Sequence, residues 1–136
     1  MIFIFDENYS PKLAAGLHLL EQGNLKSDNH AEITHIVTLA GKYGTEDEQL
    51  IKIAGNKKAI IVTQDTDFKK IKHKYPLYNQ YKVGIIFFQS FKDSKGYWNM
   101  IKSVIERWEE LKTKIKDESP PFAYKINNQG ITKLHF

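Results

Sequence analysis

Carboxylate side chains follow two apolar runs of the sequence, where predicted strands end. Asp6 comes directly after residues 2–5, and Asp65 and Asp67 come after residues 59–63. Both runs are short, continuous and rich in β-branched and aromatic residues, which is typical of strands buried on both faces of a parallel sheet. Because sites in such sheets form beyond the carboxyl ends of the strands, we expect these acids to lie close together at one edge.

Another acid, Asp47, lies at the start of a predicted helix that precedes the second of these strands, and this position lets it approach the same edge. Glu7 and Glu48 are reserve candidates. Taken singly, each acid also has an ordinary interpretation, as a loop residue, a first-turn acid that favours the helix dipole, or a residue that stabilises a turn. The combination favours a shared site.

Such a group of acids would need a cation. Three or four carboxylates held about 4 Å apart repel one another by roughly 1 kcal/mol per pair even in water-like surroundings. The chain has no cysteine, and its histidines show no recognisable metal-ligand spacing. Oxygen ligands select hard ions such as Mg²⁺ or Mn²⁺. A cation of this kind can activate water for in-line attack on phosphorus, so the acids predict phosphodiester hydrolysis.

The segments that must position these acids alternate between strand-like and helix-like patterns. Parallel strands need crossover connections, and the crossovers cover the faces of the sheet. The sequence therefore predicts a three-layer α/β domain with a mostly parallel central sheet of about four strands flanked by helices, plus a C-terminal hairpin. The predicted strands are residues 2–5, 33–39, 59–63 and 83–88, and the hairpin strands are residues 122–126 and 131–136.

The first helix carries the clearest local signals. Ser10 is a good N-cap, Pro11 suits the first helical position, and Gly23 can end the helix. Its predicted apolar face consists of Leu13, Leu17 and Leu20.

Residues that commonly begin or end helices bound two later segments. A capping-box pattern at residues 45–48 predicts a helix that runs to about Ala54 and ends at Gly55. Pro76 is expected to close a lysine-rich segment at residues 69–74.

A long amphipathic helix is predicted at residues 94–116, where the apolar pattern changes to period 3.6. Trp98 and Trp108 share its apolar stripe, so we expect them to serve in core or subunit packing rather than in base stacking. The full stripe consists of Trp98, Ile101, Val104, Ile105, Trp108, Leu111 and Ile115.

Three segments in order resemble a known family. They are residues 3–11 (FIFDENYSP), residues 44–50 (GTEDEQL) and residues 60–68 (IIVTQDTDF). Together they resemble the PIN-like proteins, a branch of the PIN nuclease superfamily that includes VapC-type toxins. The resemblance covers about the first 90 residues, and the closing PPFAYKI segment is similar to a tail of some VapC-type members.

This resemblance implies a metal-dependent endoribonuclease that cuts RNA and uses Mg²⁺ or Mn²⁺. It favours Asp47 over Glu48 as the helix-borne acid. It also implies a toxin that a cognate antitoxin protein holds inactive. The implied catalytic and metal-binding residues are Asp6, Asp47, Asp65 and Asp67, with Thr63 as a supporting hydroxyl.

A lysine-rich segment begins two residues after Asp67 and is placed to line the rim of the acidic site. There it would hold the RNA backbone through phosphate contacts, although a solvated helix face is an equally good interpretation. The net charge of +4, from 20 Lys and Arg against 16 Asp and Glu, favours polyanions only modestly. The candidate phosphate-binding residues are Lys12, Lys69, Lys70, Lys72 and Lys74.

The length of 136 residues and a hydrophobic content of 41% suit one domain that folds without disulfides. We expect a single domain over residues 1–136, with the motif-bearing core at 1–90, the long helix at 94–116 and a hairpin or tail at 120–136. The apolar start is too short for a membrane span and lacks the pattern of a signal peptide, so a cytoplasmic protein without a membrane partner is expected. A homodimer is compatible with the long helix.

Two alternatives remain open at this point. A PIN-like fold can keep its acids and only bind RNA or a protein, without cutting. A receiver-type phosphoacceptor domain also places acids at strand ends, but it needs a lone acceptor aspartate after its third strand and a lysine after its fifth. Here paired acids follow the third strand, and the run at residues 83–88 ends without a lysine.

Overall fold

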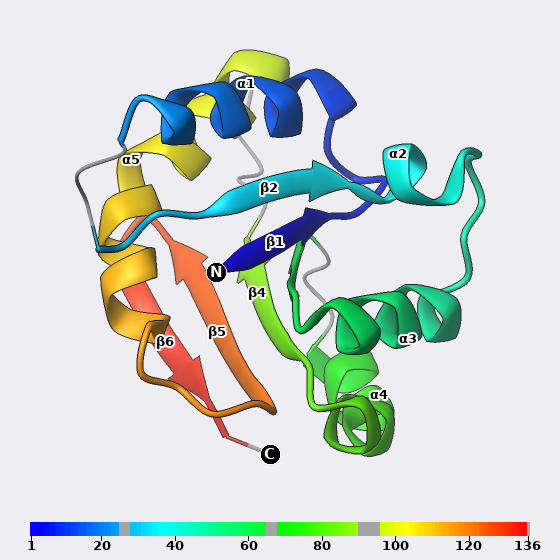
Figure 1. Cartoon of the computed structure of the whole chain (residues 1–136). Coiled ribbons are helices and arrows are strands. Elements are labelled where there is room, and N and C mark those ends of the chain that lie inside the picture. The colour runs from blue at the N-terminus through cyan, green and yellow to red at the C-terminus, as the bar shows by residue number, and fades with distance from the viewer. Residues whose placement is uncertain (25–27, 65–67, 90–95, 136) are drawn as a thin grey trace.

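A computed structural model of the chain describes residues 1–24, 28–64, 68–89 and 96–135, and for residues 68 and 69 it describes the backbone alone. Its centre is a sheet with the strands β1 (Ile2–Phe5), β2 (Glu32–His35), β3 (Ile60–Thr63), β4 (Gly84–Phe88), β5 (Phe122–Asn127) and β6 (Gly130–Leu134). The order in the sheet is β2-β1-β3-β4-β5-β6 (Figure 1). Strands β1 to β5 are parallel, and β6 returns antiparallel to β5. The predicted hairpin is therefore confirmed, and it extends the central sheet.

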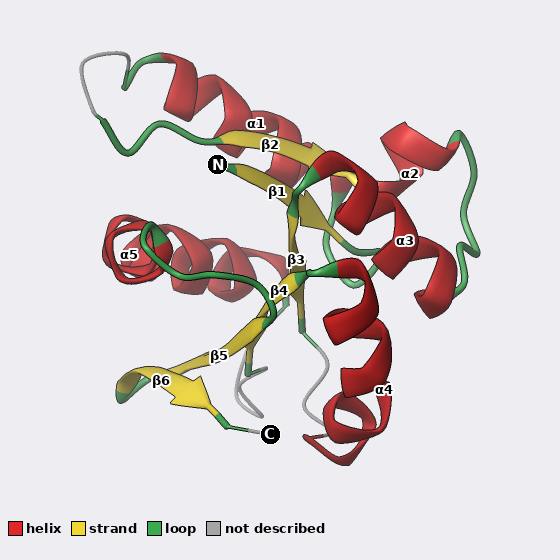
Figure 2. Cartoon of the chain, turned by 60° about the horizontal axis from the view of Figure 1, so that its bottom comes forward, coloured by secondary structure: helices red, strands yellow, loops and turns green. Residues whose placement is uncertain are grey.

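Helices cover both faces of this sheet. They are α1 (Pro11–Gln22), α2 (Ile36–Ala40), α3 (Asp47–Lys57), α4 (Phe68–Tyr81) and α5 (Tyr97–Ile115). Figure 2 shows α1 and α5 on one side of the sheet and α3 and α4 on the other. The predicted three-layer α/β architecture is confirmed. None of the described helices has the length and apolar character needed to cross a membrane.

Strand β1 shows why the buried runs are apolar at every position. Phe3 and Phe5 belong to the core between the sheet and helices α1 and α5, whereas Ile4 belongs to the core beneath α3 and α4. All three side chains are 0% exposed. Each fully buried side chain of this size stabilises the fold by about 1.5–3 kcal/mol relative to an exposed one, so neither face of the strand tolerates a polar residue.

Helix α1 begins and ends as predicted, but its buried face differs by one residue. Ser10 Oγ accepts a hydrogen bond from the backbone N–H of Lys12 at 3.1 Å, and Gly23 follows the last turn. Leu20 is 63% exposed, whereas Glu21 is 4% exposed. The prediction for Leu20 is wrong because Glu21 is buried against Lys112 and Trp108 of α5.

The predicted second strand, residues 33–39, is wrong in its second half. The strand ends at His35, and the short helix α2 follows at once. The imidazole of His35 explains the change, because its Nδ1 accepts from the backbone N–H of Val37 at 3.1 Å and caps the helix. Its Nε2 then carries the proton and donates to the carbonyl of Tyr9 at 2.7 Å.

The predicted capping box and the predicted end of helix α3 are both wrong. The N-cap residue is Glu46, which makes no side-chain cap bond, and the helix continues through Gly55 to Lys57. Gly55 does not terminate the helix because it lies where α4 crosses closely. A Cβ at this position would lie 2.7 Å from the carbonyl oxygen of Tyr81.

Pro76 does not close the lysine-rich segment, because it lies inside α4. A proline inside a helix costs about 3 kcal/mol or more through the lost hydrogen bond and ring clash. The buried side chains of Ile71 and Tyr78, on either side of it, pack against the sheet and offset this cost.

The predicted stripe of α5 is buried only in part. Trp108 is 5% exposed and lies in the core, but Trp98 is 69% and Ile105 48% exposed. These two residues are therefore not core residues of the described chain, and whether a subunit covers them stays a prediction.

Candidate functional site

The carboxyl ends of β1 and β3 lie side by side, as the sequence predicts. Phe5 pairs with Val62 in the parallel register, and the backbone N–H of Asp6 donates to the carbonyl of Val62 at 3.1 Å. The next residue of β3 is Thr63, which is 5% exposed. Asp6 is thus held in place by backbone pairing within the sheet.

A pocket with a cavity volume of about 80 Å³ opens at this edge, between α3, α4 and the sheet. Such a volume has room for several water molecules. Its polar lining combines two acids, two lysines, an amide and a hydroxyl, which are Asp6, Asp47, Lys70, Lys74, Asn8 and Thr63. Its apolar lining is Leu50, Ile51, Ile61, Ile71, Tyr78, Ile85 and Phe87.

Asp6 is the partly buried acid of the pocket. Its carboxylate accepts from the backbone N–H of Asn8 at 3.0 Å and from the Asn8 side-chain amide at 3.3 Å. Burial raises the pKa of Asp6, hydrogen bonds from Thr63 and Asn8 lower it, and the negative charge of Asp47 raises it, so that the resulting pKa is about 6. The site therefore holds negative charge at a cost that a cation would relieve.

Asp47 enters the pocket from the first turn of α3 and pairs with Lys74 of α4. The Asp47 side chain is 68% exposed and that of Lys74 is 23% exposed. Lys70 also lines the pocket. Lys12 and Lys72 are exposed and do not line it.

Three predicted site residues fall outside the described part. Asp65 and Asp67 follow β3 within the undescribed residues 65–67, and the side chain of Lys69 is likewise undescribed. Within the described ranges, no group of three or more His, Cys, Asp or Glu side chains is arranged to hold a metal ion. The structure therefore brings together Asp6 and Asp47 of the four predicted acids.

The donors of the pocket match the chemistry of a hard cation. Asp6, Asp47 and Thr63 supply carboxylate and hydroxyl oxygens, which Mg²⁺ and Mn²⁺ prefer. The reserve acids lie differently. Glu48 is exposed on α3, and Glu7 accepts hydrogen bonds from the loop that precedes α3.

Two features of the site were not predicted from the sequence. Asn8 bridges Asp6 and Thr63, since its side-chain amide lies 3.3 Å from the Asp6 carboxylate and 3.4 Å from Thr63 Oγ1. An asparagine two residues after a strand-end aspartate is a turn signal that could have suggested this contact. The pairing of Lys74 with Asp47 had no signal in the sequence, because it depends on how α3 and α4 pack.

Comparison with known families agrees with this geometry. A family model described as a PIN like domain matches residues 1–90 of the chain. This range includes every residue that lines the pocket. No curated protein and no solved structure gives a match. The family match spans more than half of the 136 residues, and the chain therefore belongs to the PIN-like domain family.

Proposed function

We propose that this protein is a metal-dependent endoribonuclease and that it acts as the toxin of a toxin–antitoxin pair. One observation carries the nuclease proposal: Asp6 and Asp47 come from distant parts of the sequence and line one pocket, beside Lys70 and Lys74. Membership of the PIN-like family supports it. The toxin role rests on the resemblance of the motifs to VapC-type proteins.

The residues of the pocket have separate tasks in this proposal. Asp6 and Asp47 hold Mg²⁺ or Mn²⁺, and Asp65 and Asp67 complete the ligand set. When bound, the cation supplies activation of water and neutralisation of charge on the phosphate. Asn8 and Thr63 orient the Asp6 carboxylate through hydrogen bonds. The two lysines attract and position the RNA backbone.

The test is cleavage of a mixed set of single-stranded RNAs by the purified protein with Mn²⁺ or Mg²⁺. Asp6→Asn and Asp65→Asn are expected to lower the cleavage rate by at least about 100-fold, since even outer-shell changes at metal sites cost about 10–100-fold. Glu48→Gln is the matched control, because it removes one acid beside Asp47 and should keep most of the activity. Wild-type protein that cuts no RNA with either metal would contradict the proposal.

A binding module without catalysis is the second candidate, and the pairing of Asp47 with Lys74 favours it, because a lysine there already neutralises one acid. Such a module would bind RNA equally well in EDTA and never cut it.

The toxin role needs its own test. Expression of the wild type, but not of Asp6→Asn, should arrest bacterial growth, and co-expression of a neighbouring antitoxin gene should restore it.

A further inference from the structure

The loop that leads into α3 is held by Glu7, which lies in the segment that follows β1. Glu7 Oε1 accepts hydrogen bonds from the backbone N–H of Gly44 at 2.6 Å and of Thr45 at 3.2 Å. One side-chain oxygen of Glu7 thus accepts from two neighbouring N–H groups of the same loop. Glu7 therefore ties this loop to the segment that follows β1.

The sequence of α3 supplies little else that fixes its start. The N-cap residue Glu46 makes no side-chain cap bond. The hydroxyl of Thr45 is buried and has no hydrogen-bond partner within the described residues. Gly41 and Gly44 have positive φ angles of 73° and 85°, and glycines lose much conformational freedom when a loop is ordered. The two bonds to Glu7 therefore hold the part of this loop that directly precedes α3.

The hydrogen bonds of Glu7 join two segments, and each segment carries one of the two acids of the pocket. Glu7 directly follows Asp6, whose backbone is bonded to Val62 of β3. Thr45 lies two residues before Asp47, which begins α3. The core residues of α3 and the pairing with Lys74 hold the helix and Asp47 from one side, and the Glu7 bonds hold the loop that enters the helix from the other.

From this arrangement we infer that Glu7 is a positioning residue, which sets the separation of Asp6 and Asp47 so that a divalent cation meets a preformed pair of carboxylates. The inference rests on the proposed metal-dependent function and replaces the expectation that Glu7 is a reserve metal ligand. Its carboxylate serves the loop, and its effect on the cation passes through Asp47.

The test measures Mn²⁺ binding to the full chain by isothermal titration calorimetry, without RNA. Glu7→Gln keeps an acceptor oxygen at the same reach but removes the charge, whereas Glu7→Asp keeps the charge and shortens the side chain. A positioning role predicts that Glu7→Gln binds Mn²⁺ within about threefold of the control Glu106→Gln, which loses one negative charge at an exposed position of α5 outside the pocket. Glu7→Asp and Glu7→Ala should bind about tenfold more weakly, the lower end of the range for residues that orient metal ligands.

The opposite ranking would overturn the inference. If Glu7 is a ligand or acts through its charge, Glu7→Asp will bind better than Glu7→Gln. Wild-type affinity in Glu7→Ala would overturn it as well. Thermal unfolding of each variant identifies those that fail to fold, and the pair of conservative variants then decides the question without Glu7→Ala. A wild-type protein that binds no Mn²⁺ would instead remove the proposed function, and the inference with it.

Discussion

Two lysine–carboxylate pairs lie on opposite faces of the sheet, in different surroundings. Lys112 of α5 pairs with Glu21 of α1 at 2.6 Å, and the two side chains are 0% and 4% exposed. Lys74 of α4 pairs with Asp47 of α3 at the mouth of the pocket, and these side chains are 23% and 68% exposed. The same chemistry is thus closed off from solvent on one face and open to it on the other.

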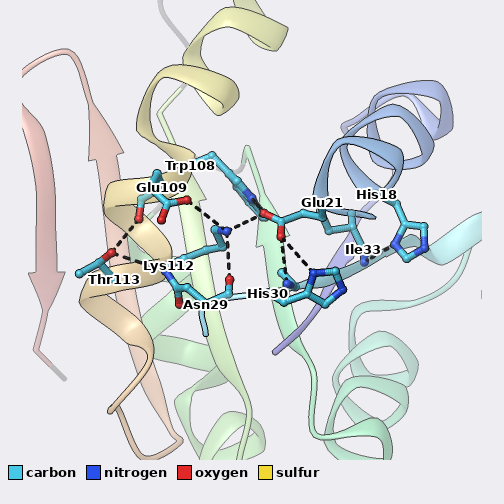
Figure 3. A network of polar contacts seen from close by, with 10 residues as sticks. His18, Glu21, Asn29, His30, Ile33, Trp108, Glu109, Lys112 and Thr113 are labelled. Atoms are coloured by element: carbon cyan, nitrogen blue, oxygen red, sulfur yellow. Dashed lines mark hydrogen bonds and ion pairs between the residues drawn. The ribbon is translucent and has the colours of Figure 1, made fainter. Parts of the chain in front are cut away.

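The buried pair has many further partners (Figure 3). Lys112 Nζ also donates to the carbonyl of Asn29 at 3.0 Å and lies 3.2 Å from Glu109. Glu21 accepts from the indole N–H of Trp108 at 2.8 Å and from the backbone N–H of Ala31 at 3.0 Å. Burial acts to raise the pKa of Glu21, but the hydrogen bonds from Lys112, Trp108 and Ala31 outweigh it and leave the pKa lowered.

This difference separates a structural pair from an exchangeable one. A buried pair with all these partners fixes the packing of α1, α5 and the entry to β2, and loss of one member leaves an uncompensated buried charge. An exposed pair contributes little to stability because water and salt screen it. In the proposed function, the lysine of the open pair would leave Asp47 when the cation binds, at little cost to the fold.

The largest expected effect comes from breaking the buried pair. Lys112→Met removes the ammonium group and leaves Glu21 buried with its charge uncompensated. We expect the free energy of unfolding to fall by about 3–5 kcal/mol, measured by urea denaturation at pH 7.

The double variant Glu21→Gln with Lys112→Met is the control, because it leaves no unpaired charge. It should lose clearly less stability than the sum of the two single variants. A loss below about 1 kcal/mol in Lys112→Met would show that the buried pair does not hold the helices together.

Asp6 gives the next largest effect, with the opposite sign. Its pKa is about 6 in the folded protein and near 3.8 when unfolded, so above pH 6 its charge destabilises the fold. In EDTA at pH 8, Asp6→Asn is expected to raise the free energy of unfolding by roughly 2–3 kcal/mol. As the pH falls from about 6 to 4, the folded carboxyl takes up its proton and this gain disappears.

Urea denaturation between pH 4 and pH 8 measures this dependence. Asp117→Asn, a change at an exposed acid, should alter stability by less than about 0.5 kcal/mol at every pH. A gain in stability that is absent at pH 8, or that does not depend on pH, would mean that burial does not raise the pKa of Asp6.

The sequence predicts those elements whose signals are local and agree with their packing. Strands β1, β3 and β4 are continuous apolar runs, and α1 has a serine cap, a proline and a terminal glycine. The same kinds of signal mislead at Gly55 and Pro76. There the close crossing of α3 and α4 and the burial of the α4 side chains override the breaker residues, and a single sequence does not reveal helix crossings.

The candidate site was likewise predicted only in part. Asp6 was expected at the shared edge of parallel strands and Asp47 was expected to approach it from a helix, while the family resemblance added Thr63; all three line one pocket. The pairing of Asp47 with Lys74 was not predicted, because it depends on how α3 and α4 pack. Such pairings depend on three-dimensional distances that residue order does not specify.

The smallest expected change in stability belongs to the open pair, where the comparison is sharpest. Lys74→Gln should change the free energy of unfolding by less than about 1 kcal/mol, because the Asp47 side chain is mostly exposed. It should also tighten Mn²⁺ binding by about two- to fivefold, since a contribution of up to about 1 kcal/mol no longer competes with the cation. Calorimetric titration measures the affinity, and Lys52→Gln, at an exposed position of α3, controls for the loss of one positive charge.

Unchanged Mn²⁺ affinity in Lys74→Gln would mean that the lysine does not compete for Asp47, whereas affinity gained equally in both variants would assign the effect to overall charge. A gain specific to Lys74 would show that the pocket keeps its own replaceable counter-ion, which the buried face of the sheet does not allow.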